Sequence, residues 1–455
     1  ILAAHAPTIQ MLLWLQPLNG LAMAALLTVT ISYVQDSIKG RIGLSTSLID
    51  ILGILATLLG RYFWFARCRP GLSIHPRSVR CDRGAGWPRR PARYVAHSCR
   101  VDRGKTSLRS IAGDSSAMTA KSRFDELKIS PLGFGASPLG ELFSTMPNHV
   151  AQATLETAWK GGVRYFDTSP WYGLGLSELR VGQFLRERPR DQYVLSTKVG
   201  RLLSSPTGGR RRSPWTGGLT RNFHYDYSYD GIMRSFEDSL QRLGVERIDI
   251  LYIHDLDIPN LGSEAAVEAH LGDLITGGFR ALESLREQGV IAGFGAGVNE
   301  EGMIPRLAEH VDMDIVLYAL RYSLAEHESL EADMAFCLER NIRVAAAGVY
   351  SSGLYATGPA PNTLYNYREP SAAELERARS IQELCERHHT SLAAAAIQFP
   401  IHHPSVVSVV VGANTPGQAA ENCKLFGSPV PDDLWNDLKE QALVIKAVPL
   451  PGTLA

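Results

Sequence analysis

From Phe124 onward, short runs of β-branched and apolar residues alternate with longer amphipathic segments, and this alternation restricts the possible folds more than any other feature. It is typical of βαβ units and a parallel sheet. The predicted strands cover residues 132–136, 163–166, 193–198, 248–253, 290–295, 315–317, 343–346 and 406–410. The predicted helices cover residues 149–161, 177–187, 229–243, 277–288, 300–310, 327–340, 373–388 and 416–425. This order predicts an α/β protein whose residues 124–455 form a closed (β/α)8 TIM barrel.

A doubly wound open sheet has the same alternation of strands and helices. Such sheets commonly bind dinucleotides at a G-x-G-x-x-G turn that follows the first strand. No such motif follows residues 132–136. The sequence therefore favours the barrel.

The first part of the chain contains two apolar runs. The apolar run over residues 11–34 is long enough to span a bilayer, and the run over residues 42–65 is nearly long enough. The segment PLNGLAMAALLTVTISYVQDSIKGRIGLSTSL resembles the last helices of sugar-efflux transporters of the major facilitator superfamily. We therefore expect two transmembrane helices, a hairpin over residues 1–66 that corresponds to a transporter fragment. Two helices cannot build a transport site between repeated halves, so transport is not expected.

A basic segment separates this hairpin from the barrel. Residues 61–109 contain twelve Arg and one Lys against two Asp, whereas the whole chain carries 46 basic and 46 acidic residues, so the barrel is acidic. The composition predicts an unstructured linker over residues 67–123, and a tether for nucleic acid or lipid is the alternative. We expect no nucleic-acid partner, and contact with a membrane only through residues 1–66. Met118 is a natural start for the barrel if the join is a fused or mis-extended reading frame. If the join is genuine, its Arg-rich flank keeps the barrel cytoplasmic.

Six cysteines are spread along the chain without paired spacing. No C-x-x-C motif or Cys/His cluster is present, which argues against a zinc site or a disulfide framework. We therefore expect reduced thiols.

Polar residues stand at the ends of three consecutive predicted strands, where the active site of such a barrel lies. The second strand leads into DTSPWYG, which contains Asp167 and Tyr172. The third ends in LSTKVGR with Lys198, and the fourth ends in LYIHD with His254. Each residue alone has a simple structural interpretation, as a helix cap, a loop aromatic or a solvated charge. Together, at three strand ends, they predict a catalytic site.

These four motifs, in this order, resemble the aldo-keto reductases over residues 125–446. The resemblance implies hydride exchange between a carbinol carbon and a nicotinamide, with the cofactor supplying the redox step. Tyr172 is then the general acid/base, and Lys198 lowers its pKa from the usual value of about 10. Asp167 orients Lys198, and His254 forms a hydrogen bond with the substrate oxygen. A metal site at His254, Asp255 and Asp257 is an alternative, but no further ligand is in sight, so no metal is predicted.

The resemblance also assigns cofactor-binding positions. The segment AAGVYSSGL places Tyr350 against the nicotinamide and three residues beside the pyrophosphate, namely Ser351, Gly353 and Leu354. The segment VVVGANTPGQAAEN corresponds to the adenosine-phosphate end, with Gly412, Ala413, Asn414, Gln418, Glu421 and Asn422. Backbone amides at the helix that begins near Thr415 suit a phosphate.

Two departures from the family pattern affect the expected cofactor. Gly412 and Gln418 stand where NADP-preferring members place Lys and Arg, so NAD is expected and NADP is the alternative. Ala319 stands where the family often has a Gln that holds the carboxamide, and Asn299 is the expected replacement.

The loop over residues 199–229 carries an Arg cluster and the aromatic run NFHYDYSYDG. Because aromatic and polar side chains suit hydroxylated rings, we expect substrate contacts from Trp171, Trp215, Phe223 and Tyr225, although a lid without such contacts is the alternative. The sequence from Tyr225 to Asp257 resembles the branch that contains D-threo-aldose 1-dehydrogenases, L-fucose dehydrogenases and pyridoxal 4-dehydrogenase. It implies oxidation of an aldose at C1 to the lactone. The alternatives are pyridoxal oxidation, general aldehyde or ketone reduction, and a catalytically silent regulatory barrel of a membrane protein.

Overall fold

The computed structural model describes residues 120–206 and 214–451. The predicted hairpin over residues 1–66, most of the predicted linker and the cluster Arg210–Arg212 lie outside these ranges. Within the described ranges, no helix combines the length and the apolar character that crossing a membrane requires.

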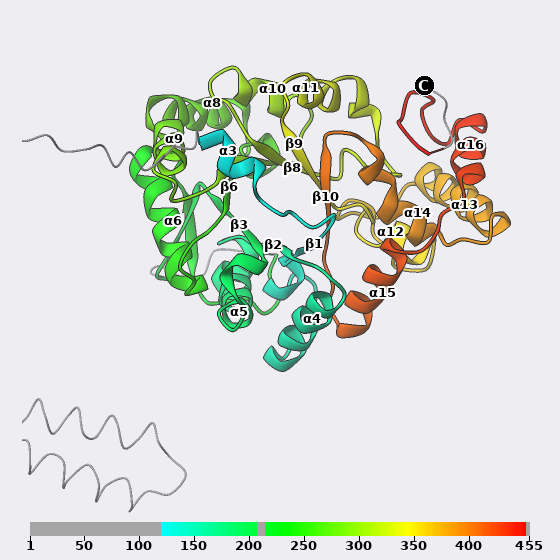
Figure 1. Cartoon of the computed structure of the whole chain (residues 1–455), viewed down its shortest axis with the longest axis horizontal. Helices are drawn as coiled ribbons and strands as arrows, with labels where there is room; N and C mark the ends of the chain where they lie inside the picture. Colours follow the sequence, from blue (N-terminus) through cyan, green and yellow to red (C-terminus); the bar gives the residue numbers. More distant parts are fainter. Residues whose placement is uncertain (1–119, 207–213, 452–455) are drawn as a thin grey trace, which may run out of the picture. The chain divides into compact units, whose positions relative to one another are not determined.

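Eight parallel strands form a closed barrel, and this confirms the predicted fold (Figure 1). In chain order the strands are β1 (Leu132–Gly135), β2 (Tyr165–Asp167), β3 (Val194–Val199), β6 (Ile250–His254), β7 (Gly293–Val298), β8 (Ile315–Ala319), β9 (Arg343–Ala347) and β10 (Val406–Val411). Each strand pairs with its neighbours along the chain, and β1 pairs with β10 to close the ring. Every predicted strand is present, but β7 begins at Gly293 rather than at residue 290, because a turn at Gly289 ends the preceding helix.

Helices surround the strands (Figure 1), and each overlaps a predicted helix, although the predicted helix over 327–340 is α-helical only in its second half because a 3-10 turn and a break at Ala332 precede it. They are α4 (Asn148–Lys160), α5 (Leu176–Leu185), α6 (Tyr229–Leu243), α9 (Phe279–Glu287), α10 (Met303–Ala308), α11 (Asp333–Glu339), α13 (Ala372–Arg387) and α15 (Pro416–Phe426). Local signals explain their ends: Ser228 caps the first turn of α6, and Gly244 ends that helix in a left-handed conformation.

Several elements were not predicted. They are the helices α3 (Ala120–Asp125), α7 (Ile258–Leu261), α8 (Glu264–Asp273), α12 (Leu354–Thr357), α14 (Leu392–Gln398) and α16 (Asp432–Glu440), and an antiparallel hairpin of β4 (Arg201–Ser204) and β5 (Asn222–Tyr225). The hairpin belongs to the long loop after β3, so it lies at the end of the barrel that carries the predicted site.

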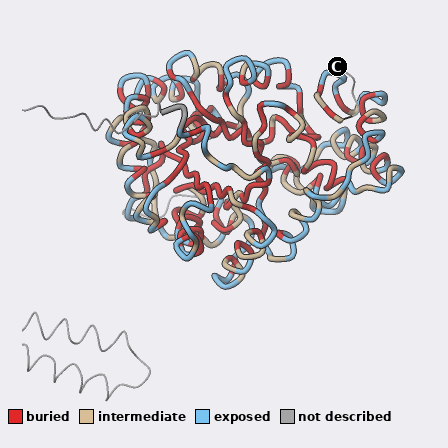
Figure 2. The backbone as a smooth tube through the Cα atoms, in the orientation of Figure 1, coloured by how far each residue is buried: buried red, intermediate tan, exposed pale blue. Residues whose placement is uncertain are grey.

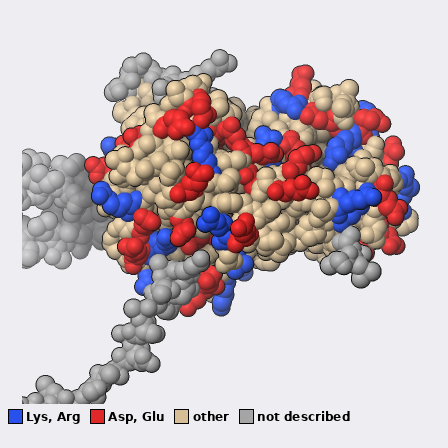
Figure 3. Space-filling model, turned by 90° about the horizontal axis from the view of Figure 1, so that it is seen from above, with Lys and Arg blue, Asp and Glu red and all other residues tan. Residues whose placement is uncertain are grey.

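Two apolar layers stabilise the barrel. Inside the ring, Ile250, Tyr252 and Leu317 pack together, and Phe124 of α3 joins the same cluster. Outside the ring, alternate strand residues such as Leu251 and Phe294 pack in the cluster shared with the helices. Figure 2 shows buried residues along the strands and the inner sides of the helices, with exposed residues around the rim. On the face seen in Figure 3, acidic and basic side chains are interspersed.

Candidate active site

A cavity of about 1130 Å³ opens at the C-terminal ends of the strands. Its wall includes Pro138 after β1, Tyr172 after β2, Lys198 on β3, His254 at the end of β6 and Asn299 after β7. This is the end of the barrel at which active sites of this architecture lie. The four residues predicted as a catalytic group, Asp167, Tyr172, Lys198 and His254, thus line one cavity.

The backbone that carries Tyr172 is held by close contact between glycines. Tyr172 begins a tight turn in which Gly173 and Leu174 have positive φ angles of 63° and 54°. A Cβ atom on Gly140 would lie 2.5 Å from the backbone nitrogen of Gly173, which leaves no room for a side chain. Two short segments far apart in sequence therefore touch through their backbones, and this contact fixes the position of Tyr172.

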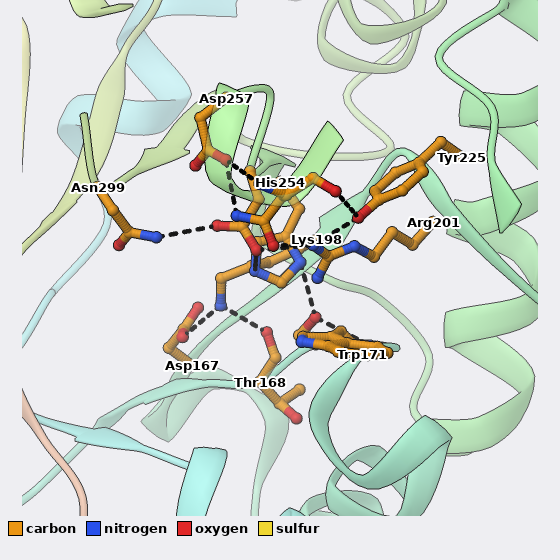
Figure 4. A network of polar contacts seen from close by, with 12 residues as sticks. Asp167, Thr168, Trp171, Lys198, Arg201, Tyr225, His254, Asp257 and Asn299 are labelled. Atoms are coloured by element: carbon orange, nitrogen blue, oxygen red, sulfur yellow. Dashed lines mark hydrogen bonds and ion pairs between the residues drawn. The ribbon is translucent and has the colours of Figure 1, made fainter. Parts of the chain in front are cut away.

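Lys198 and Asp167 form a buried ion pair (Figure 4). The Nζ atom of Lys198 lies 2.6 Å from Oδ2 of Asp167 and donates a second hydrogen bond of 2.9 Å to the carbonyl oxygen of Thr168. The hydroxyl of Ser196 donates to Oδ1 of Asp167 over 2.7 Å. The Lys198 ammonium also lies 4.6 Å from the centre of the Tyr172 ring. Asp167 thus holds Lys198 against the tyrosine, as the sequence predicted.

The predicted direction of the Tyr172 pKa is wrong. Burial raises the pKa of Tyr172 well above 10, the charges of Asp167 and Asp255 act in the same direction, and Arg201 acts against them. The prediction weighed the charge of Lys198 but not the burial of the phenol, and the charge of Lys198 is paired with Asp167 at 2.6 Å. Tyr172 is therefore a protonated phenol in this site.

Both ring nitrogens of His254 have partners in the protein. Nδ1 lies 3.1 Å from the hydroxyl of Ser169, and Nε2 lies 3.2 Å from Oδ2 of Asp255. Burial, with the positive charges of Arg201 and Lys198, lowers the pKa of His254 well below 6.5, so the ring is neutral. His254 is also close to Tyr172, with 5.9 Å between ring centres.

Asp255 is the centre of a second buried network, which was not predicted. Its Oδ2 atom lies 3.0 Å from the Arg201 guanidinium, and its Oδ1 accepts a hydrogen bond of 3.3 Å from the Asn299 amide. Asp255 has a positive φ of 47°, which is uncommon for a residue other than glycine and is typical of functional sites. Arg201 is 2% exposed and also donates to Asn260 Oδ1 over 2.8 Å.

The predicted substrate-binding aromatics divide into two pairs. Trp171 and Trp215 line the cavity, as expected for substrate contacts. Phe223 and Tyr225 are not among its lining residues, and their contact with a substrate stays a prediction. The rings of Phe223 and Tyr225 face Arg201. The guanidinium carbon of Arg201 lies 5.1 Å from the centre of the Tyr225 ring, and it also lies 4.7 Å from the centre of the Trp171 ring. Phe223 and Tyr225 belong to the hairpin, and they pack around the buried guanidinium of Arg201 instead of lining the cavity.

The predicted cofactor positions lie partly on the cavity wall. Asn299 and Gly412 line it, whereas the other predicted positions are not among its lining residues, namely Tyr350, Ser351, Gly353, Leu354, Ala413, Asn414, Gln418, Glu421 and Asn422.

Hydrogen bonds nevertheless tie the two predicted segments together. The hydroxyl of Tyr350 donates to Asn422 Oδ1 over 3.3 Å, and the Asn422 amide donates to the carbonyl oxygen of Gly412 over 3.2 Å. At the start of α15, Gln418 accepts from the Asn414 backbone nitrogen over 2.7 Å, and Thr415 caps the helix.

One buried polar atom fits a group that the protein itself does not supply. The hydroxyl of Ser351 is buried and has no hydrogen-bond partner among the described residues. Ser351 and Ser352 both have positive φ angles, of 47° and 58°, directly before Gly353. A strained turn that presents an unsatisfied hydroxyl suits the phosphate oxygens of a dinucleotide.

The two carboxylates of the alternative metal site at His254, Asp255 and Asp257 form other contacts. Asp255 pairs with Arg201, and Asp257 accepts hydrogen bonds from the Asn260 backbone and side chain at the start of α7. In residues 120–206 and 214–451, no group of three or more His, Cys, Asp and Glu side chains could hold a metal ion.

Three residues of the site, Arg201, Asp255 and Tyr367, were not predicted to take part in catalysis or in substrate or cofactor binding. Arg201 stands within the motif LSTKVGR, and Asp255 directly follows His254, so position alone could have flagged both. Tyr367 lines the cavity from the segment after α12, has a φ of 68° and is 63% exposed. No sequence pattern points to it, because its position depends on the folded path of that segment.

Comparisons with known proteins agree on one family. The sequence pattern of the aldo/keto reductase family matches residues 131–442. Pyridoxal 4-dehydrogenase from Microbacterium luteolum is 39% identical over 329 residues, which cover 70% of this chain and 95% of that protein. D-threo-aldose 1-dehydrogenase from a Pseudomonas species is 38% identical over 330 residues, which cover 70% of this chain and 95% of that protein.

Solved structures agree on the fold. An aldo-keto reductase from Bacillus halodurans in its holo form is similar with a TM-score of 0.55 at 24% identity, covering 71% of this chain and 94% of that one. The glycerol dehydrogenase from Gluconobacter oxydans is similar with a TM-score of 0.55 at 22% identity, covering 72% of this chain and 96% of that one. At these identities the similarity concerns the barrel alone.

Proposed function

The chain belongs to the aldo/keto reductase family and is an oxidoreductase that acts on CH–OH groups, and from this premise we propose that it oxidises a cyclic hemiacetal to a lactone with a nicotinamide cofactor. The observation that carries the proposal is the convergence of Tyr172, the Lys198–Asp167 pair and His254 on one cavity. A nicotinamide supplies the acceptor for the hydride.

The chemistry divides between the substrate and the protein. The carbinol carbon loses a hydride to the nicotinamide, its hydroxyl loses a proton, and the carbon–oxygen double bond of the lactone forms. Tyr172 exchanges that proton as general acid/base, since its phenol lies in the cavity beside His254. In oxidation the phenol first gives its own proton to solvent, and the phenolate then accepts the substrate proton as the hydride leaves. In reduction the phenol donates its proton to the carbonyl oxygen. Lys198 stabilises negative charge that develops on Tyr172 during proton transfer, and Asp167 keeps Lys198 in place.

The substrate class follows from chemistry common to aldoses and pyridoxal. Both carry an aldehyde and a hydroxyl that can close a cyclic hemiacetal, and both names occur among relatives of similar identity, 38% and 39%. An aldose such as L-fucose or another D-threo-aldose is our first candidate. Trp171 and Trp215 on the cavity wall support it, because aromatic faces pack against the apolar faces of sugar rings. Pyridoxal is the second candidate, and general aldehyde or ketone reduction is the third.

The proposed cofactor is NAD rather than NADP. Its pyrophosphate would lie beside Ser351 and Gly353, and its adenosine end beside Asn414, Gln418 and Glu421. The carboxylate of Glu421 opposes a 2′-phosphate, and the nearby Lys424 already forms an ion pair with it at 3.8 Å. Asn299 on the cavity wall would hold the nicotinamide carboxamide.

Product analysis distinguishes these candidates. The full chain is incubated with NAD or NADP and with L-fucose, D-arabinose or pyridoxal, and the products are identified by mass spectrometry. Formation of a lactone from a sugar with NAD supports the first candidate, and a lactone from pyridoxal alone moves the substrate to the second. Reduction of simple aldehydes without lactone formation supports the third. If no substrate reacts in either direction although the cofactor binds, the proposal is wrong and the barrel is catalytically silent.

A further inference from the structure

The cavity wall carries more carboxylates than cations. Among the described residues that line it, the cations are Lys198 and Arg321, and the carboxylates are Asp167, Asp255, Asp257, Glu300 and Glu301. Lys198 is paired with Asp167 at 2.6 Å, and Arg321 is paired with Glu326 at 2.5 Å. Each cation of this part of the wall therefore already has a carboxylate partner.

A further cation, Arg201, lies behind the wall and not on it. Its guanidinium is 2% exposed and does not line the cavity, whereas its partner Asp255 does. Trp171 and Tyr225 pack on the guanidinium, and Asn260 accepts a hydrogen bond of 2.8 Å from it. The positive charge of Arg201 is thus neutralised by Asp255, which stands at the cavity surface.

The Asp255 carboxylate is held in a fixed orientation next to His254. Arg201 and His254 Nε2 contact Oδ2 at 3.0 Å and 3.2 Å, and Asn299 donates to Oδ1 over 3.3 Å. A carboxylate has about four acceptor positions and no donor, so a group that joins it from the cavity must bring a hydrogen. A hydroxyl meets this requirement, whereas a phosphate or a carboxylate brings like charge.

We propose that Asp255, fixed by Arg201, determines the charge selectivity of the site: it accepts a hydrogen bond from a substrate hydroxyl near the reacting carbon and excludes substrates with an anionic group at that place. The inference rests on the proposed function, because it assigns the cavity to a hydroxylated substrate. It adds that the substrate is neutral, as a free sugar or an unphosphorylated vitamin is. Asp255 is a specificity-determining residue in this account, and Arg201 is a positioning residue.

The proposed exclusion of anions predicts how a substitution of Asp255 changes the binding of phosphate. Asp255→Asn keeps the shape of the side chain but leaves the charge of Arg201 unpaired behind the wall. An anion near the cavity surface then meets a cation instead of a carboxylate. The variant should therefore gain affinity for inorganic phosphate, by at least about tenfold. In the double variant Asp255→Asn with Arg201→Gln, both charges are absent, and the gain should disappear.

The test measures phosphate binding by calorimetry on the full chain, with and without saturating NAD, at constant ionic strength. The wild type, Asp255→Asn and the double variant are compared after thermal unfolding confirms that each is folded. The matched control is Glu301→Gln, which removes one exposed carboxylate from the cavity rim. Because solvent screens that position, phosphate affinity should change by less than about threefold.

A gain in Asp255→Asn that is lost in the double variant supports the proposal. It is overturned if the wild type binds phosphate as tightly as Asp255→Asn, if Asp255→Asn shows no gain, or if Glu301→Gln produces the same gain. A chain that fails to bind or turn over nicotinamide refutes the proposed function alone, since phosphate binding is measured without turnover.

Discussion

The ammonium of Lys198 lies 2.6 Å from the carboxylate of Asp167, and the two side chains are 1% and 3% exposed. Removing both charges from water costs free energy, which their attraction and the hydrogen bonds from Ser196 to Asp167 and from Lys198 to Thr168 offset. The pair places the Lys198 ammonium beside the Tyr172 ring, and Asp167 already balances the charge of that ammonium. Tyr172 is therefore a phenol at rest, which can donate its proton in reduction and must release it to solvent before it accepts the substrate proton in oxidation.

Asp167→Asn should strongly destabilise the fold, because it leaves the Lys198 charge buried without a counter-charge. We expect a loss of about 3–5 kcal/mol in the free energy of unfolding, measured by urea denaturation. The control is Asp238→Asn, which removes a partly exposed carboxylate 3.8 Å from the exposed Arg234 on helix α6. It should change the free energy of unfolding by less than about 0.5 kcal/mol. Equal effects of the two substitutions would contradict the importance of the buried pair.

Gly140→Ala should impair turnover by moving the turn that carries Tyr172. The new Cβ would lie 2.5 Å from the Gly173 nitrogen, so the two backbones must separate. We expect kcat to fall at least about tenfold, since small displacements of catalytic groups reduce rates strongly. Gly272→Ala in helix α8 is the matched control, because its Cβ would meet no atom within 4 Å and its stability should rise by about 0.4–1 kcal/mol. Normal kcat in Gly140→Ala would show that the contact does not position Tyr172.

The pH dependence of aldehyde reduction should be flat over a wide range. The pKa of His254 is lowered well below 6.5 by burial, and that of Tyr172 is raised well above 10 by burial. From about pH 6.5 to 9, His254 therefore stays neutral and Tyr172 stays protonated, and kcat at saturating reduced cofactor should vary by less than about threefold. A decrease centred below pH 9 that vanishes in Tyr172→Phe would mean that the tyrosine pKa is lowered after all.

The sequence predicted the barrel and the convergence of the four site residues because both depend on local patterns. Strand runs such as 248–253 end at one edge of a parallel barrel, so His254 and Lys198 had to approach each other. Local sequence patterns did not predict the hairpin of β4 and β5. Phe223 and Tyr225 resembled a sugar-binding surface in sequence, but cross-strand pairing turns their rings toward Arg201.

The protonation states of the site depended on three-dimensional contacts. Neither the pairing of Lys198 with Asp167 at 2.6 Å nor the depth at which Tyr172 is buried can be measured from local sequence patterns, and the burial reverses the predicted direction of the Tyr172 pKa. The role of Asp255 likewise depends on contacts with Arg201 and Asn299, which are far away along the chain.

The central claim is that Tyr172 exchanges the proton in a nicotinamide-dependent oxidation, and one measurement tests it most directly. The absorbance of reduced nicotinamide is followed when the full chain and Tyr172→Phe are given NAD with L-fucose, D-arabinose or pyridoxal, and NAD affinity is measured for both proteins. We predict turnover by the wild type, a loss of at least about 100-fold in Tyr172→Phe and unchanged NAD affinity. Undiminished turnover in Tyr172→Phe, or NAD binding without turnover of any of these substrates by the wild type, would contradict the account.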